Sequence, residues 1–440
     1  MKIALINSAT DPGGRNIRES IISLLHENDD NFFPLAQSAD IEFIEINGRL
    51  IYADDIDKQT DADIIIFMSR HASTTNPVPA LTVHVTGNFA EAEMGGKARS
   101  LPPAATPYMH AVLNNMHDYA PAGYRVSYEV THHGPTCLKT PSFFAEIGST
   151  ENEWKDKEAG NAVALSILNA AHSNVIPLVG FGGTHYAPRQ TEISLRTRGA
   201  FGHIVPSRMA DTIDRKMIEE MVERTVAVAA YIDRKSIPKN TRNKLENMIE
   251  KTGLQIVSES EINSAGMVGW HQYLIIKKLA NEVQPGARPI INADPTYNAP
   301  TIIELPEELI SEAWKSDKSA LLSGLSNLQI VHLYGKDGAL MPRMITESGM
   351  EQQIIHALIT LCVKILTYSG NTTVGKNKLV ITQTKFDPER ARKYGIEKGP
   401  DFGKLVSGQK IIRDGLTITP EMVHTCKKKE IHIPGLEKYL

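Results

Sequence analysis

Short apolar runs alternate with amphipathic segments along the first half of the chain. The apolar run 2–8 ends in the turn cluster Thr10-Asp11-Pro12-Gly13-Gly14, and isoleucine and leucine then recur at helical spacing from 17 to 25. The run 62–68 is almost entirely apolar with a β-branched centre, which is typical of a strand buried on both faces. The same patterns predict strands at 41–46, 81–85, 124–131, 143–147 and 175–181, and helices at 108–117, 158–172, 214–232 and 241–251.

Strands that are separated by helices pair in parallel through crossover connections. We therefore expect an α/β fold, a three-layer sandwich with a mostly parallel sheet. Antiparallel or mixed neighbours remain possible near 41–52.

The pattern changes near residue 281, where a segment rich in proline begins. Prolines 285, 289, 295, 300 and 306 indicate an extended connection. A second alternation follows, with helices expected at 306–315, 352–368 and 388–394, strands at 328–333 and 378–382, and short strands and turns at 403–433. We predict a first domain at 1–280, a proline-rich connection at 281–306, and a smaller C-terminal α/β domain at 307–440 whose role is unknown.

Charge and cysteine content exclude some classes of protein. With 47 basic and 51 acidic residues the formal net charge is −4, which excludes binding of polyanions by bulk charge but permits a local basic patch. The three cysteines form no close-spaced metal motif and no disulfide framework, so we expect no disulfide partner and a reducing, cytoplasmic location. The longest apolar stretch, 354–366, is interrupted by His356, Thr360 and Lys364, so we expect no membrane partner.

Histidine is concentrated in the first domain. Nine of the fifteen histidines lie between residues 71 and 203, at 71, 84, 110, 117, 132, 133, 172, 185 and 203. Several follow predicted strands: His84, the pair His132-His133, and His185, with His203 in Phe201-Gly202-His203. Because ligands bind beyond the carboxyl ends of parallel strands, we expect these loops to meet at one cleft.

Neutral imidazole is both a metal ligand and a general base near neutral pH. Two or three histidines with one glutamate and an open position suit Zn²⁺, which lowers the pKa of bound water. Glu129 and Glu146 are the carboxylates nearest in sequence. Arg189 could bind a phosphate or carboxylate, and the glycines at 182 and 183 would let backbone amides approach an oxyanion. The candidate metal ligands are His84, His132 and His203, and the candidate catalytic residues are His133, His185 and Glu146.

Other interpretations of these motifs remain open. The histidines of HHGPT and GGTHYAPRQ could instead cap strand ends, and no HExxH or paired Cys/His motif indicates zinc from spacing. The turn at 10–14 matches neither phosphate-loop pattern, and no GxSxG elbow predicts a serine nucleophile. Cys137, beside the histidine pair, is more typical of a small half-buried thiol than of a nucleophile.

Six motifs, in order between Met1 and about Lys277, resemble the archaeal and plant type of D-aminoacyl-tRNA deacylase. They are LTVH with TGN at 81–88, GGK at 95–97, EVTHHGPT at 129–136, FAEIGST at 144–150, GFGGTHYAPRQ at 180–190 and FGH at 201–203. The resemblance implies hydrolysis of the ester between a D-amino acid and the 3′-terminal ribose of tRNA, and dependence on zinc. It also implies a fold similar to bacterial peptidyl-tRNA hydrolase and the phosphorylase/hydrolase group. It does not say which residues hold the metal, and it leaves the chain beyond about 285 as an extension.

On this reading, water activated by the metal or by His133 attacks the ester, and His185, Arg189 or backbone amides steady the oxyanion. The partner is tRNA carrying a D-amino acid, and Pro135 or Gly183 could exclude the L-enantiomer by a clash. Thr184 and Lys97, in the same motifs, are further candidates for substrate binding. A peptidyl-tRNA hydrolase, a zinc amidohydrolase or a non-enzymatic RNA-end-binding protein remain as alternatives, and we expect a monomer or a small homo-oligomer.

A short stretch of the extension, from 391 to 423, is similar to part of the tRNA 3′-processing enzyme ribonuclease Z. It lacks that family's metal-binding histidine motif, so no nuclease activity is expected. The stretch is either a plain helix followed by turns and strands, or an RNA-end-binding or scaffolding element that uses basic residues at 390, 392, 393, 398 and 404.

Overall fold

The structure is a computed structural model that describes the whole chain except residues 29–31, 74–76, 293–296, 369 and 440. Two compact units make up the chain, Met1–Asn263 and Ser264–Leu440. Among the described residues, no helix combines the length and the apolar character that crossing a bilayer requires. All three cysteines are free.

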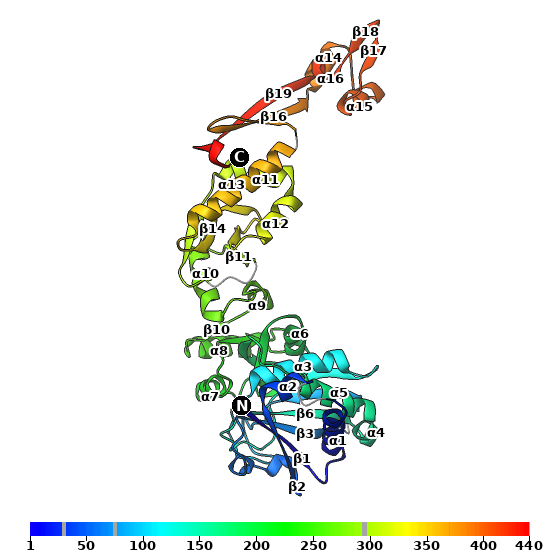
Figure 1. The fold of residues 1–440 in the computed structure, drawn as a ribbon, viewed down its shortest axis with the longest axis vertical. Coiled ribbons are helices and arrows are strands. Elements are labelled where there is room, and N and C mark those ends of the chain that lie inside the picture. The colour runs from blue at the N-terminus through cyan, green and yellow to red at the C-terminus, as the bar shows by residue number, and fades with distance from the viewer. Residues whose placement is uncertain (29–31, 74–76, 293–296, 369, 440) are drawn as a thin grey trace. The chain divides into compact units, whose positions relative to one another are not determined.

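The first unit is built on a mixed sheet of six strands in the order β2-β1-β3-β6-β4-β5 (Figure 1). These strands are β1 (Lys2–Ser8), β2 (Asp40–Ile46), β3 (Ile64–Ala72), β4 (Ala80–His84), β5 (Arg125–Tyr128) and β6 (Ser142–Ser149). All neighbours pair in parallel except β4 and β6. The mostly parallel sheet is therefore confirmed, and its antiparallel neighbour is β4 rather than the segment near 41–52.

One face of this sheet is covered by helices that the sequence pattern predicts. Helix α5 (Lys157–Leu168) lies between α1 (Pro12–Glu27) and α3 (Thr106–Tyr119), and all three contact the strands. On the opposite face, Ile65 and Phe67 pack with Leu50 and Ile56 of the short 3-10 helices η1 (Leu50–Tyr52) and η2 (Ile56–Lys58). Strand β3 is thus buried on both faces, as its continuous apolar run predicts.

A second sheet of the same unit is wholly parallel, in the order β10-β9-β7-β8. Its elements are β7 (Ile176–Phe181), α6 (Pro188–Arg196), β8 (Gly199–Val205), α7 (Arg215–Thr225), β9 (Ala229–Ile232), α8 (Lys239–Glu250) and β10 (Gln255–Ile256). The predicted helix 214–232 is wrong after Thr225. Val226 adopts a left-handed conformation that ends α7, and 229–232 form a strand that pairs with β7. An alanine-rich strand with no polar alternation is indistinguishable from a buried helix by periodicity. Strand β8 was not predicted, because its glycines weaken the strand pattern.

The segment after β5 connects the two sheets. The Val130 amide donates to the His185 carbonyl at 3.0 Å, and the Ala187 amide donates to the Tyr128 carbonyl at 3.0 Å. The loop after β7 is therefore held against the end of β5, and histidines from both loops are brought together.

The second unit combines helices with antiparallel sheets. Its four-stranded sheet has the order β11-β13-β14-β12, and β15-β16-β19 and β17-β18 form two smaller sheets. The strands are β11 (Arg288–Ile291), β12 (Pro300–Glu304), β13 (Val331–Tyr334), β14 (Leu340–Glu347), β15 (Thr372–Val374), β16 (Lys378–Phe386), β17 (Ile411–Arg413), β18 (Leu416–Ile418) and β19 (His424–His432). The longer helices are α10 (Trp270–Val283), α11 (Glu307–Ser316), α12 (Lys318–Ser326) and α13 (Glu351–Tyr368), and α14 (Pro388–Lys393), α15 (Pro400–Val406) and α16 (Pro420–Val423) are short. The segment 281–306, predicted as an extended connection, instead supplies strands β11 and β12 of this unit. The predicted division of the chain into domains with different roles stays a prediction.

Candidate active site

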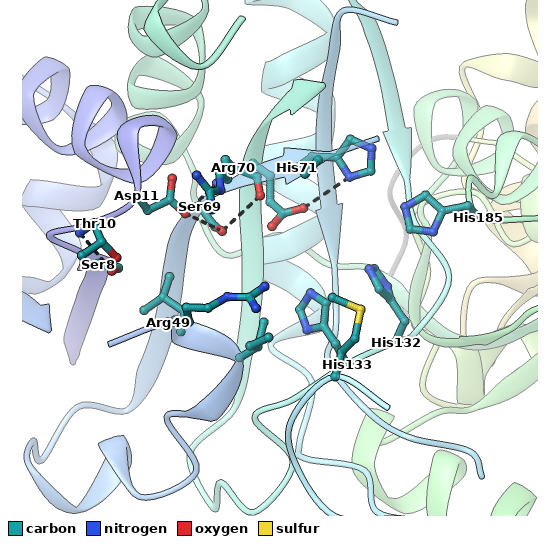
Figure 2. Close-up of a pocket in the computed structure, with 15 residues that line it drawn as sticks. Ser8, Thr10, Asp11, Arg49, Ser69, Arg70, His71, His132, His133 and His185 are labelled. Carbon is teal, nitrogen blue, oxygen red and sulfur yellow. Dashed lines mark hydrogen bonds and ion pairs between the residues drawn. The ribbon is translucent and has the colours of Figure 1, made fainter. Parts of the chain in front are cut away.

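Five side chains from separate elements line one face of a cavity of about 220 Å³ in the first unit (Figure 2). They are His71 near the end of β3, His132 and His133 after β5, Glu146 in β6 and His185 after β7. His84, the last residue of β4, and Glu129 are fully buried behind them. The sequence predicts that the loops of His84, His132-His133, His185 and His203 meet at one cleft. The rings of His84, His132, His133 and His185 lie together, whereas His203 does not line the cavity.

Strand register explains why β3 and β6 contribute to the same face. Ser69 pairs with Glu146 and His71 with Gly148, so the side chains of Ser69, His71 and Glu146 project from one side of the sheet. A Cβ atom at Gly148 would lie 2.6 Å from the His71 ring. Glycine at this position therefore makes room for the imidazole.

The other side of the cavity is formed by the turn between β1 and α1. Asp11 caps α1 by accepting from the amides of Gly13 and Gly14 at 2.9 and 3.1 Å, and its second oxygen accepts from the Arg70 amide at 3.1 Å. A Cβ atom at Gly14 would lie 2.4 Å from the Met68 carbonyl oxygen. The glycines let the turn pack directly on the end of β3, and the turn is a structural cap rather than a phosphate loop.

Glu129 lies at the centre of the cluster. Its Oε1 is 2.9 Å from His71 Nδ1, and its Oε2 is 3.0 Å from His185 Nε2 and 3.4 Å from His132 Nε2. Neither carboxylate oxygen has a partner with hydrogen-bond geometry among the described residues. The buried carboxylate therefore keeps lone pairs directed at the same region as the imidazoles.

Backbone carbonyls fix the tautomers of three histidines. Nδ1 of His132 donates to the Val130 carbonyl at 2.8 Å, Nδ1 of His133 to the Gly134 carbonyl at 2.7 Å, and Nδ1 of His84 to the Val85 carbonyl at 3.3 Å. Because a carbonyl oxygen can only accept, Nδ1 carries a hydrogen and Nε2 has no backbone partner. This is the arrangement in which protein imidazoles bind metal ions.

Local electrostatics divide the histidines into two classes. Burial lowers the pKa of His133 to about 4 and that of His132 well below its usual value, and positive charge on His84 adds to both shifts. Burial also disfavours the charged form of His71, but Glu129 and Glu146 outweigh it and raise the pKa of His71 to about 9. Two imidazoles are therefore neutral at pH 7, and His71 is a cation beside the Glu129 carboxylate.

The conformation of His133 is itself unusual. Its φ of 45° lies in the left-handed region, which is unfavourable for a residue with a side chain. This conformation turns the chain between His132 and Gly134 so that both imidazole rings, 4.4 Å apart, belong to the cluster. Strain of this kind is concentrated at functional sites.

Three overlapping groups in the cluster could hold a metal ion. Each group brings its ligand atoms within 4.8 Å of one another, and the groups are His84-His132-His133, His71-Glu129-His185 and His84-Glu129-Glu146. The first group joins the three residues whose Nε2 lone pairs are free, and His84 Nε2 is buried without a hydrogen-bond partner among the described residues. The donor set of the first group therefore fits Zn²⁺.

His203 and Arg189 are predicted site residues whose side chains are engaged outside the cavity. His203 in β8 donates from Nε2 to the Pro102 carbonyl at 2.9 Å, and its Nδ1 is 3.2 Å from the Thr131 hydroxyl. With both ring nitrogens satisfied, it belongs to none of the three groups found among the described residues. Arg189, at the start of α6, is paired with Glu192 and Glu259 instead of facing the cavity.

The remaining predicted substrate contacts surround the site without lining it. The Gly183 amide is bonded to the hydroxyls of Ser207 and Ser236 at 3.1 and 3.3 Å, so it is not free for an oxyanion. Thr184 and the side chain of Lys97 are exposed, and the Pro135 carbonyl accepts from Thr86 at 2.6 Å.

Sequence reasoning missed His71 and the arginines of the cavity, Arg49 and Arg70. His71 lies just beyond the strand predicted at 62–68. The strand of the structure continues to Ala72, so a longer predicted strand would have placed His71 near its end. Arg49 lies in an irregular segment with no periodic signal, so its place depends on tertiary packing alone.

Comparisons with known proteins agree with the site. A sequence model of D-aminoacyl-tRNA deacylase matches residues 58–257. Curated proteins named D-aminoacyl-tRNA deacylase are 47% identical in Methanoculleus marisnigri and 44% in Methanoregula boonei, each over the whole of both chains. A protein of the same name from Methanosarcina acetivorans is 39% identical over 279 residues, which cover 59% of this chain and 93% of its own.

Among solved structures, the crystal structure of a conserved protein of unknown function is 32% identical with a TM-score of 0.54. It covers 59% of this chain and 96% of its own. The matched share is about the length of the first unit, whereas the relatives from Methanoculleus and Methanoregula extend over both units. The chain belongs to the D-aminoacyl-tRNA deacylase family.

Proposed function

We propose that this protein hydrolyses the ester bond between a D-amino acid and the 3′-terminal ribose of tRNA, releasing free D-amino acid and tRNA. Family membership supplies the reaction class. The observation that carries the proposal is the cluster of imidazoles with free Nε2 lone pairs on the wall of one cavity. A protein that only binds RNA has little use for such a cluster.

In this proposal His84, His132 and His133 hold a Zn²⁺ ion. When bound there, zinc lowers the pKa of a water molecule and polarises the ester carbonyl. The carbonyls of Val85, Val130 and Gly134 keep the three imidazoles oriented through Nδ1. Glu146 raises the pKa of His84 despite burial, so a proton and a metal ion compete for Nε2 of that residue. This set replaces His203 of the sequence prediction with His133.

His185 is our candidate general base. It is 46% exposed at the cavity wall, and its Nε2 lies 3.0 Å from Oε2 of Glu129. A carboxylate behind an imidazole orients the ring and stabilises its protonated form, which is what acceptance of a proton from water requires. The His71 cation, 2.9 Å from Glu129, offsets the negative charge of this buried carboxylate, and Glu146 lines the cavity as the second acid.

Chiral selection requires a wall that cannot move. Pro135 and Gly183 do not line the cavity in this structure, and we keep them as candidates for chiral selection because both lie on loops held by hydrogen bonds to Thr86 and Ser207. Thr184 and Lys97, exposed near these loops, remain candidates for contacts to tRNA. We also propose that the protein is cytoplasmic. We further propose that its fold is a three-layer sandwich similar to bacterial peptidyl-tRNA hydrolase and the phosphorylase/hydrolase group.

The test compares three substrates on the purified full chain: D-tyrosyl-tRNA, L-tyrosyl-tRNA and N-acetyl-L-tyrosyl-tRNA. The proposal expects release of free D-tyrosine, with the two L-substrates cleaved at least about 10²-fold more slowly. Preferred cleavage of the N-acetyl substrate would instead indicate a peptidyl-tRNA hydrolase. Binding of tRNA without any product would indicate an RNA-end-binding protein.

A further inference from the structure

Two arginines and one aspartate, Asp11, line the cavity besides the histidines and Glu146. Arg49, next to η1, and Arg70, near the end of β3, line it together with the hydroxyls of Ser8, Thr10 and Ser69 (Figure 2). Among the described residues, neither guanidinium is joined to a carboxylate by an ion pair. Burial raises the pKa of Asp11, and the charge of Arg70 opposes this shift. Two unpaired arginines on one cavity wall are notable in a chain whose formal net charge is −4.

Both arginines are positioned by contacts that leave their hydrogen-bond donors free. The Arg70 guanidinium lies 4.8 Å from the centre of the Trp154 ring, and its backbone amide is fixed by Asp11 at 3.1 Å. Arg49 lies 5.8 Å from the Tyr52 ring, and Figure 2 shows its side chain directed into the cavity toward His133. Stacking on an aromatic ring holds the plane of a guanidinium while its N–H groups remain available to an anion.

The substrate class of the proposed function carries an anion at a suitable place. The ester to be cleaved has no formal negative charge, and the nearest one is the phosphate that joins the terminal adenosine to the preceding nucleotide. Guanidinium groups bind phosphate oxygens in bidentate geometry. The Ser69 hydroxyl donates to Asp11 at 3.2 Å and the Ser8 and Thr10 hydroxyls bond each other at 2.9 Å, so the two arginines supply the charged contacts. Histidines and arginines around one cavity therefore match the ester and the phosphate of one terminal nucleotide.

We propose that Arg49 and Arg70 bind the phosphodiester group of the 3′-terminal nucleotide and so orient the aminoacyl ester toward the histidine cluster. This assignment rests on the proposed function for the identity of the ligand. The two arginines are positioning residues, because they contact the substrate away from the ester carbonyl.

Equilibrium binding of two stable probes tests the assignment on the full chain. Both probes are adenosines carrying D-tyrosine through a 3′-amide, and one also has a 5′-phosphate methyl ester. The intact protein is expected to bind the phosphorylated probe at least about tenfold more tightly. Arg49→Gln and Arg70→Gln are each expected to abolish most of this preference and to change binding of the uncharged probe by less than about twofold.

Two controls separate the phosphate contact from loss of structure. Arg15→Gln removes an exposed arginine of α1 that pairs with Glu19 and lies outside this cavity, and should preserve the preference. Arg70→Lys keeps the positive charge and should retain part of the preference, which a collapsed site would not. Circular dichroism of each variant verifies folding.

The outcomes distinguish this inference from the proposed function. Equal binding of the two probes by the intact protein overturns the phosphate contact, even if D-tyrosyl-tRNA is hydrolysed. Equal weakening of both probes by the glutamine variants also overturns it, because the arginines would then contact the aminoacyl part. Should no D-aminoacyl ester be cleaved, the proposed function fails, while the difference between the probes still decides the phosphate contact.

Discussion

The histidines around the cavity and the buried histidines elsewhere in the chain use their ring nitrogens differently. His84, His132 and His133 each bond a backbone carbonyl through Nδ1 and leave Nε2 free of a backbone partner. His203 in β8 engages Pro102 through Nε2 and Thr131 through Nδ1, and His332 in β13 accepts from Asn292 at 2.9 Å. His84 in the first group is as deeply buried as His203 and His332 in the second. The free Nε2 lone pair, rather than burial or a lowered pKa, distinguishes a candidate ligand from a structural histidine.

The largest expected effect follows from removing an imidazole of the cavity. His133→Ala removes a proposed metal ligand and His185→Ala removes the proposed base, and each should lower kcat/KM for D-tyrosyl-tRNA by at least about 10². The single-turnover rate at saturating enzyme measures the chemical step directly.

His117→Ala is the matched control, because His117 lies on the exposed side of α3. Its rate should equal that of the intact protein. Near-normal turnover by both His133→Ala and His185→Ala, with folding unchanged, would refute the assigned roles.

Metal content gives a second way to separate the two groups of histidines. His132→Gln removes one of three proposed ligands and should lower zinc affinity by at least about tenfold, whereas His203→Gln should leave it unchanged. Elemental analysis after dialysis against a series of chelator concentrations measures this affinity without reference to activity. Loss of zinc from both His132→Gln and His203→Gln would restore the ligand set predicted from the sequence, because His132 belongs to both sets.

Local patterns predicted the strands that build the site but not all of its residues. The apolar runs located β1, β3, β6 and β7 because a strand buried on both faces has a distinctive composition. The loops between them were located by their glycines and histidines, so convergence of His84, His132, His133 and His185 could be expected. The exclusion of His203 from the candidate metal site could not be predicted from the sequence. It depends on a hydrogen bond to the Pro102 carbonyl, which lies 101 residues away in sequence.

Other differences have a similar origin in tertiary contacts. The alanine-rich segment 229–232 has an ambiguous period, and only pairing with β7 and β10 makes it a strand. Glu129 was visible as a carboxylate near the histidines, but its contacts with His71 and His185 depend on three strands meeting. Arg49 follows the same rule, since nothing local marks its side chain as part of a cavity.

Acid should destabilise the first unit through His203. Burial lowers its pKa from 6.5 to about 4, so at pH 7 the residue is neutral in both the folded and the unfolded states. Between about pH 6.5 and 4 only the unfolded state takes up the proton, and stability falls as the pH falls. At pH 5 this loss amounts to about 2 kcal/mol relative to pH 7.

Chemical denaturation at pH 7 and pH 5 measures this loss for the intact protein and for His203→Gln. The substitution costs stability at pH 7, because the hydrogen bonds to Pro102 and Thr131 are weakened. It should nevertheless reduce the additional loss at pH 5 by about 2 kcal/mol. An unchanged pH dependence in the variant would mean that His203 is protonated in the folded state, which contradicts its satisfied Nδ1.

The smallest effect is expected from removing the second unit. The match to the Methanosarcina acetivorans protein covers 93% of that protein but only 59% of this chain. The whole histidine cluster lies within Met1–Asn263. A chain ending at Asn263 should therefore fold and retain kcat for D-tyrosyl-tRNA within about twofold, since domains with their own core fold alone. A rise in KM with constant kcat would assign RNA binding to the extension, where basic residues gather from 390 to 404. A fall in kcat in a folded, zinc-loaded truncated protein would instead mean that the chemical step depends on both units. The free Nε2 atoms of the histidine cluster would then not be enough to define the active site.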